Sequence, residues 1–301
     1  MSQNFRIFSI NPANQSNTMA VRQVVAGTLH NALPASPTAM TVVPSENEPM
    51  LLVYDSSAGA AQGYVLDAAT ADLIATTSFT IGTGWDIIEP YVSDQVSSLM
   101  CYRASDGIFA FYKLATPLPS AVQFALTHNP GMTKGYTTTK PFLTRRGLAF
   151  LGYNQANGSV ALYSFPAGQA HPACVWWHQW ARGWTRFAFF QFGGENFFFK
   201  TNVAKLNVNI DHVLDGLRAG TIEVGTKLPL SNALQLTAVE PLTLANGDPH
   251  FVAYMPDGTA TLNRFNGDCL GWTSLATWNS LPNGTHVVPF RIGADAYVLF
   301  A

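Results

Sequence analysis

Short apolar segments alternate with turn residues along the chain, and their order repeats. Each repeat begins with an apolar strand around a proline or phenylalanine. A second apolar strand ending in an aromatic residue follows, then a glycine turn and a third strand. The proline or phenylalanine recurs every 46 to 52 residues, at Pro44, Pro90, Pro141, Phe189, Pro241 and Pro289. This period, with several strands in each unit, predicts an all-β repeat fold.

The clearest repeat follows Gly84-Trp85 and sets the strand assignment for the others. It predicts strands at 87–92, 97–102, 108–114 and 120–126. These segments are short, rich in β-branched or aromatic residues and bounded by turn residues, as strands are. Tyrosines that end second strands are expected to pack between repeats. One insert, at 203–217, departs from the pattern and predicts a short helix or a long hairpin.

Six copies of the repeat in one chain predict a six-bladed β-propeller, with residues 1–301 forming a single domain. The last copy has only two strands, at 286–290 and 294–300. The segment Phe5–Ile10 resembles the third strands of the complete copies. We therefore expect the N-terminal strand to pair with the C-terminal blade and close the ring, which removes free sheet edges.

Composition narrows the class of protein further. Apolar residues make up 48% of the chain and charged residues 11%, which excludes a disordered chain. A net charge of −2 without a basic cluster argues against nucleic-acid binding. No apolar stretch is long enough to span a membrane, and the N-terminus lacks the pattern of a signal peptide, so we expect a cytoplasmic protein. The three cysteines, at 101, 174 and 269, lack metal-binding spacing and are expected to be buried thiols.

The informative residues for function are those at which the six copies differ. Immediately before three of the anchors stand Glu89, Lys140 and Glu240, and two residues earlier in other copies stand Arg186 and His286. The corresponding positions elsewhere are mostly apolar or small. Because the polar residues do not recur with the repeat, they favour one asymmetric site on the ring axis over six equal sites. Neutral drift at solvated positions and a lectin with one or two remaining sites are the alternatives.

Tryptophans are concentrated in the connections between repeats. Trp85, Trp180, Trp184 and Trp272 lie there, and Arg103 follows a second strand nearby in sequence. Aromatic walls with a few polar donors are typical of pockets for apolar molecules of drug size. Tryptophans are also sugar-stacking platforms, so this feature does not separate the two kinds of ligand. Most phenylalanines are expected in the core.

Motifs for other chemistry are missing from the sequence. It has no GxSxG, HExxH, P-loop or dinucleotide-binding motif, so we expect no cofactor. His171 and His178 lie near each other without a carboxylate partner in sequence, which argues against a metal site. The pair Asp211-His212 is interpreted as a solvated turn within the insert.

Two resemblances follow from these features. The phrase Gly-Trp-x-x-x-x-Pro-aromatic resembles lectin-like β-propellers at the level of the scaffold, although the repeated Arg/Glu/Trp set of fucose lectins is missing. In size, blade number and asymmetric apolar interior, the chain also resembles the fungal hetero-Diels–Alderases. These are cofactor-free propeller enzymes of tropolone–sesquiterpenoid biosynthesis, and the likeness is not carried by a motif.

The second resemblance implies a cofactor-independent cyclase of natural product biosynthesis that holds a small apolar substrate in the central funnel. A donor among Lys140, Arg186 and His286 would stabilise negative charge on a carbonyl oxygen. Either Glu89 or Glu240 would act as acid or base. The substrate would lie against Arg103 and the four tryptophans named above. The alternatives are a carbohydrate-binding lectin with sites between blades and a protein-interaction scaffold.

Overall fold

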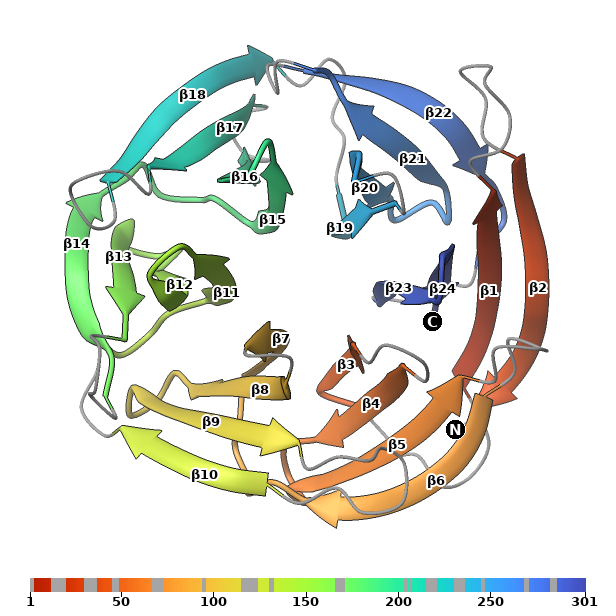
Figure 1. Cartoon of the computed structure of the whole chain (residues 1–301), viewed down its shortest axis with the longest axis horizontal. Helices are drawn as coiled ribbons and strands as arrows, with labels where there is room; N and C mark the ends of the chain where they lie inside the picture. Colours follow the sequence, from red (N-terminus) through yellow and green to blue (C-terminus); the bar gives the residue numbers. More distant parts are fainter. Residues whose placement is uncertain are drawn as a thin grey trace. The chain divides into compact units, whose positions relative to one another are not determined.

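Every regular element in the described part of the chain is a β-strand (Figure 1). The computed structural model describes residues 3–11, 20–29, 37–44, 49–66, 73–93, 96–114, 124–129, 133–165, 171–202, 205, 207–214, 221–229, 236–244, 247–267, 271–281 and 286–301. Within these ranges no helix is long and apolar enough to cross a membrane. The chain divides into two compact units, which are Met1–Gln3 with Leu29–Trp180 and Asn4–Thr28 with Ala181–Ala301.

The first unit contains three four-stranded antiparallel sheets, each made of consecutive strands. One sheet consists of β3 (Ala39–Val43), β4 (Met50–Asp55), β5 (Ala60–Leu66) and β6 (Leu73–Thr80). The next consists of β7 (Ile87–Ser93), β8 (Val96–Arg103), β9 (Ile108–Leu114) and β10 (Phe124–Asn129). The third consists of β11 (Thr138–Thr144), β12 (Gly147–Tyr153), β13 (Ser159–Ser164) and β14 (Ala173–Gln179).

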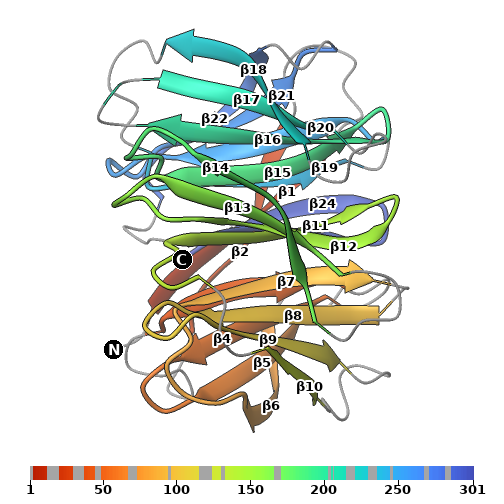
Figure 2. The ribbon, with the colours of Figure 1, turned by 90° about the vertical axis from the view of Figure 1, so that its left-hand side faces the viewer.

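The second unit also contains three four-stranded antiparallel sheets. One consists of β15 (Arg186–Phe192), β16 (Glu195–Asn202), β17 (Asn207–Leu214) and β18 (Thr221–Pro229), which run side by side in Figure 2. The next consists of β19 (Ala238–Thr243), β20 (Pro249–Tyr254), β21 (Ala260–Phe265) and β22 (Trp272–Trp278). The last has the order β2 (Ala20–Leu29), β1 (Gln3–Asn11), β24 (Asp295–Phe300) and β23 (Val287–Ile292).

The last of these sheets contains strands from both ends of the chain and confirms their predicted pairing. In this sheet β1 lies antiparallel to β24, with Arg6 opposite Phe300 and Ile10 opposite Ala296. The N-terminal strand therefore supplies the third strand that the last repeat lacks. Together the sheets form an all-β, propeller-like fold. Closure into a ring of six blades and the single domain stay predictions.

Two predicted elements differ from those observed. The insert at 203–217 contains β17, which pairs with β16 and β18, so the helix alternative is wrong for its described residues 207–214. The fourth strand expected at 120–126 is β10, which begins at Phe124, and 120–123 lie outside the described residues. Strand β10 is the outer strand of its sheet, where strand boundaries are hard to read from sequence, whereas β17 lies inside its sheet between β16 and β18.

Apolar residues from facing sheets fill the space between neighbouring sheets within each unit. Between the second and third sheets of the first unit, Phe109 packs against Phe150 at 4.7 Å, and Phe150 stacks on Tyr163 at 4.9 Å between ring centroids. This packing brings first strands side by side, β7 next to β11 (Figure 1). Each first strand is an edge of its sheet, so Pro90 and Pro141 leave no ladder hydrogen bond unmade there.

Tyrosines at the ends of second strands connect one sheet to the segment that enters the next. The Tyr54 hydroxyl donates to the carbonyl of Gly82 at 2.7 Å, and the Tyr102 hydroxyl donates to that of Thr133 at 2.8 Å. The Tyr102 hydroxyl also accepts from the backbone N–H of Tyr136 at 3.0 Å. Burial raises the pKa of both tyrosines to about 12. The predicted packing of these tyrosines between repeats is confirmed.

The described cysteines differ in their surroundings. Cys101 is fully buried, and burial raises the pKa of its thiol. Cys174 is exposed on β14, so the prediction of a buried thiol is wrong at this position. An edge strand such as β14 has only one neighbour in its sheet, which leaves its side chains more accessible than those of a central strand. Cys269 lies outside the described residues.

Candidate functional site

A carboxylate and an ammonium group meet on neighbouring first strands of the first unit. Glu89 lies on β7 and Lys140 on β11, each immediately before the proline of its strand. Lys140 Nζ is 2.7 Å from Glu89 Oε1, and the side chains are 19% and 20% exposed. The adjacent residues Ile88 and Thr139 are buried, so strand alternation leaves the charged pair at the accessible side.

The pair combines two groups with complementary chemistry. A partly desolvated carboxylate is a proton acceptor, and a nearby ammonium stabilises negative charge on oxygen. Because four-fifths of each side chain is covered, the field of the ammonium is less screened than at an open surface. The arrangement is suited to a reaction in which a proton leaves a nucleophile while charge develops on a carbonyl oxygen.

The second unit holds a similar group on its own first strands. Arg186 begins β15, Glu240 lies on neighbouring β19, and His286 immediately precedes β23. Burial lowers the pKa of Arg186, while the Glu240 carboxylate acts in the opposite direction. Arg186 Nη1 donates to the carbonyl of Thr185 at 3.3 Å. The carboxylate of Glu240 therefore compensates part of the cost of covering the guanidinium.

His286 is held through its backbone at the end of the chain. Its N–H donates to the carbonyl of Ala301 at 3.1 Å, and the N–H of Ala301 donates to the carbonyl of His286 at 3.0 Å. Burial lowers the pKa of the imidazole, which favours its neutral form near pH 7. The predicted polar residues thus fall into two groups, one in each unit. That all of them line one central site stays a prediction.

Trp85 and Trp184 are buried, each with 5% of its surface exposed. The Trp85 indole N–H donates to the carbonyl of Ile81 at 2.6 Å. The Trp184 ring lies 4.7 Å from Lys200 Nζ. These rings pack inside their units and have little free surface. Their predicted contact with a substrate stays a prediction.

Trp180 and Trp272 are partly buried and also pack on aromatic neighbours. The Trp180 ring lies 5.8 Å from Tyr153, between ring centroids. The Trp272 ring lies 5.5 Å from Phe199 and 5.6 Å from Phe251, both edge-on. Most of the surface of each indole is used in packing of this kind. Substrate contact at Trp180 and Trp272 stays a prediction.

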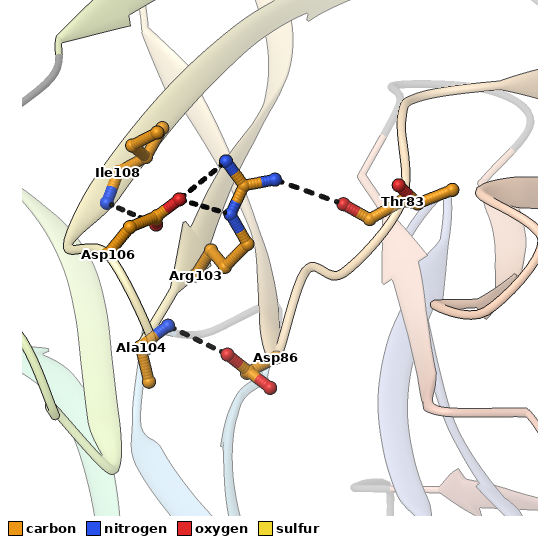
Figure 3. A network of polar contacts seen from close by, with 6 residues as sticks. All are labelled: Thr83, Asp86, Arg103, Ala104, Asp106 and Ile108. Carbon is orange, nitrogen blue, oxygen red and sulfur yellow. Dashed lines mark hydrogen bonds and ion pairs between the residues drawn. The ribbon is translucent and has the colours of Figure 1, made fainter.

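Arg103 belongs to a polar network at the turn between β8 and β9 (Figure 3). Its Nε donates to Asp106 Oδ2 at 2.7 Å, and Nη1 donates to the carbonyl of Thr83 at 3.4 Å. The backbone N–H of Ala104 donates to Asp86 Oδ2 at 2.7 Å in the same network. Hydrogen bonding to Asp106 raises the pKa of Arg103, and the same bond lowers the pKa of Asp106.

The Arg103 side chain therefore connects a hairpin turn to the segment before β7. Its guanidinium also lies 5.4 Å above the Trp85 ring. These contacts use the N–H groups of the guanidinium and one of its faces, and they explain its position. The predicted role of Arg103 in substrate binding stays a prediction.

Sequence reasoning missed a buried ion pair in the second unit. Lys200 on β16 contacts Asp211 on β17, and their side chains are 2% and 0% exposed. The interpretation of Asp211 as part of a solvated turn is therefore wrong. A lysine at the end of a phenylalanine run was the available signal, because a charge inside an apolar strand needs a buried partner.

No metal centre is evident among the described residues, where three or more His, Cys, Asp or Glu side chains nowhere gather closely enough to hold an ion. His178 is exposed and packs on Trp176 at 5.7 Å between ring centroids. The two charged groups described above are thus the polar arrangements from which we argue function.

Comparison with known proteins adds information on the fold. No family model and no curated protein matches the sequence. A candidate 6-phosphogluconolactonase of Bacteroides fragilis is similar in structure, with 10% identity, coverage of 95% of this chain and 84% of that chain, and a TM-score of 0.56. A candidate 6-phosphogluconolactonase of Bacteroides uniformis has 12% identity, coverage of 95% and 84%, and a TM-score of 0.55.

A third similar structure is the periplasmic gluconolactonase of Pseudomonas aeruginosa, with 13% identity, coverage of 95% of this chain and 85% of that chain, and a TM-score of 0.55. At these identities the likeness shows the fold alone. It supports the propeller-like assignment. The expected likeness to fungal hetero-Diels–Alderases is not shown.

The functional prediction requires a correction. The three solved structures described above are named as gluconolactonases or candidate 6-phosphogluconolactonases, and they come from bacteria. Neither a cyclase nor a lectin is among these three, so both predicted functions are overturned. The error has its source in the sequence, which carries no catalytic motif, because one fold supports many functions.

Proposed function

We propose that this chain is a hydrolase that opens a polar lactone, with Glu89 and Lys140 as its reacting pair. The observation that carries the proposal is the 2.7 Å contact between these side chains on neighbouring first strands, where both remain partly exposed. The names of the structurally similar lactonases support the choice of a lactone as the substrate class.

The proposed mechanism uses the pair in two steps. Glu89 accepts a proton from a water molecule as the water oxygen attacks the lactone carbonyl carbon. The carbonyl oxygen becomes an oxyanion, which the Lys140 ammonium stabilises. The carbon–oxygen bond of the ring then breaks, and Glu89 returns the proton to the departing ring oxygen. The product is an open-chain hydroxy acid, and the carboxylate and ammonium are restored.

The ion pair explains how one carboxylate serves both steps. In the free protein, Lys140 holds the Glu89 carboxylate in place through their 2.7 Å contact. When a carbonyl oxygen takes up part of the ammonium's hydrogen bonding, a carboxylate oxygen is released to accept a hydrogen bond from water. Substrate binding and activation of the base are thereby coupled. The reaction requires only water as a second reactant.

Arg186, Glu240 and His286 form the second candidate group. A carboxylate beside a cation is again present, and burial lowers the pKa of Arg186. We assign the chemistry to the first group because Lys140 Nζ and Glu89 Oε1 are 2.7 Å apart and both side chains remain partly exposed. We further propose that the six sheets are the blades of one ring, an arrangement supported by the pairing of β1 with β24.

Proton release during the opening of glucono-δ-lactone and of its 6-phosphate tests the proposal. We expect the protein to accelerate the opening of at least one of them above the buffer rate. Glu89→Gln should lower kcat by about 100-fold or more, because it removes the proton acceptor. Lys140→Met should lower kcat by about 100-fold, the usual effect of losing one oxyanion donor.

Asp106→Asn is the matched control, because it alters a carboxylate that is also ion-paired, at 2.7 Å from Arg103, but lies at a hairpin turn. It should retain the wild-type rate. Absence of acceleration by the wild type with both lactones contradicts the proposal. A fully active Glu89→Gln variant also contradicts it, and a loss confined to Glu240→Gln would transfer the chemistry to the second group.

A further inference from the structure

Lys200 and Asp211 form a buried ionisable pair that the proposed hydrolysis does not use. Lys200 lies on β16 and Asp211 on neighbouring β17, in the ladder where Phe198 stands opposite Asp211. Lys200 Nζ donates to Asp211 Oδ2. The two side chains are 2% and 0% exposed, so solvent has almost no access to either group.

The surroundings of the pair are largely aromatic. Lys200 Nζ lies 4.7 Å from the centre of the Trp184 ring and 5.4 Å from that of Phe198. Phe189 stacks on Phe198 with their centroids 5.0 Å apart. The ring faces keep the lysine nitrogen beside the carboxyl group. Aromatic surroundings also disfavour separated charges, which promotes transfer of one proton from the ammonium to the carboxylate.

Asn209 is a further buried polar residue next to the pair in the ladder. It stands opposite Lys200 in the ladder between β16 and β17, a position whose side chains lie within reach of each other. Asn209 is 3% exposed, and its Oδ1 has no hydrogen-bond partner among the described residues. This oxygen is placed to accept a hydrogen bond from a neutral lysine amine, and Asn209 is thus a positioning residue.

We propose that Lys200 and Asp211 become joined by an intramolecular isopeptide bond. Proton transfer within the pair first gives a neutral amine and a carboxylic acid. The lone pair of Nζ attacks the carboxyl carbon, and the carbon–oxygen bond to the hydroxyl group breaks. The departing hydroxyl takes a proton from the nitrogen and leaves as water. One amide bond is formed, one water molecule is released, and no oxidant or other reactant is consumed.

Intact mass spectrometry of the acid-denatured wild-type protein tests this inference. We expect a mass lower than that of the sequence by one water molecule. Digestion with trypsin should give a branched product in which peptide 187–205 is joined to peptide 206–218, because an acylated Lys200 is not cleaved. The full sequence mass, with normal cleavage after Lys200, overturns the inference and leaves a buried ion pair.

Two substitutions by arginine assign the bond to its residues. Lys200→Arg should restore the full sequence mass, because the guanidinium does not form this amide. Lys140→Arg is the matched control, since Lys140 is also ion-paired but partly exposed, and it should retain the loss of one water. A water loss that persists in Lys200→Arg, or disappears in Lys140→Arg, contradicts the assignment. The wild-type mass decides the question even if either variant fails to fold.

The positioning role of Asn209 is tested by the rate at which the cross-linked protein forms. In freshly synthesised protein, Asn209→Leu should slow the appearance of the cross-linked mass by about tenfold, the scale expected for losing one orienting hydrogen bond. A cross-linking rate equal to that of the wild type overturns the positioning role. The measurement follows mass against time in the folded fraction, so a change in stability alone does not move it.

Discussion

The Tyr102 hydroxyl is expected to contribute measurably to the stability of the first unit. Tyr102→Phe removes the donor to the Thr133 carbonyl at 2.8 Å and the acceptor for the Tyr136 N–H at 3.0 Å. Tyr136 is buried, so its N–H is left without a partner, which costs about 1–3 kcal/mol. Thr133 is exposed, and water replaces the lost donor there. We expect a loss of about 2 kcal/mol in the free energy of unfolding.

The same substitution at Tyr64 is the matched control. Tyr64 is 5% exposed, and its buried hydroxyl has no hydrogen-bond partner among the described residues. Replacing it with phenylalanine removes a polar group that is already unsatisfied, so stability should be unchanged or rise by up to about 1 kcal/mol. Urea unfolding followed by tryptophan fluorescence measures both variants. A difference below about 0.5 kcal/mol between them refutes the assignment of the tyrosine contacts.

Three further predictions concern stability. Burial lowers the pKa of His250, so the folded protein favours the neutral imidazole. The free energy of unfolding should therefore fall as the pH drops below about 6.5, and it should fall less in His250→Gln. Thermal unfolding at several pH values measures both proteins. Gly152→Ala places a methyl group against a buried tyrosine ring and should cost about 1–3 kcal/mol in urea unfolding, whereas Gly267→Ala meets no atom within 4 Å and should be neutral. Phe190→Ala should cost about 3–5 kcal/mol in the same assay, because its ring is buried, whereas Trp177→Ala, at a ring 64% exposed, should change stability by less than about 0.5 kcal/mol.

Much of the fold could be predicted because the apolar pattern repeats. The first, second and third strands of the repeat after Trp85 were expected within one or two residues of β7, β8 and β9. The glycine expected after the second strand has φ of +76° at Gly107, a conformation that few other residues adopt. Pairing of 5–10 with the C-terminal strand followed from the strand that the last repeat lacks.

The residues that the sequence misplaced depend on contacts distant along the chain. Asp211 was interpreted as solvated because aspartate usually favours turns. Its carboxylate is instead buried, because it forms an ion pair with Lys200 on the adjacent strand. The burial of Trp85 could not be read from sequence either, because its position in a connection says nothing about what covers it. Burial is a property of the assembled sheets and is not encoded in local spacing.

The candidate site also depends on contacts between residues that are distant along the chain. The sequence placed Glu89 and Lys140 at equivalent positions in successive repeats but could not show that they meet, because contact depends on the packing of two sheets and on side-chain conformation. The substrate class was predicted incorrectly, since one fold supports many functions and no catalytic motif is present.

A double-mutant cycle on the hydrolysis of glucono-δ-lactone tests whether Glu89 and Lys140 act as one reacting pair. We will compare kcat/KM for the wild type, Glu89→Gln, Lys140→Met and the double variant. We expect a loss of about 100-fold for each single variant and little further loss when both are combined, because the two side chains act on the same transition state. Equal rates for all four proteins, or losses that multiply fully in the double variant, would contradict a jointly acting pair.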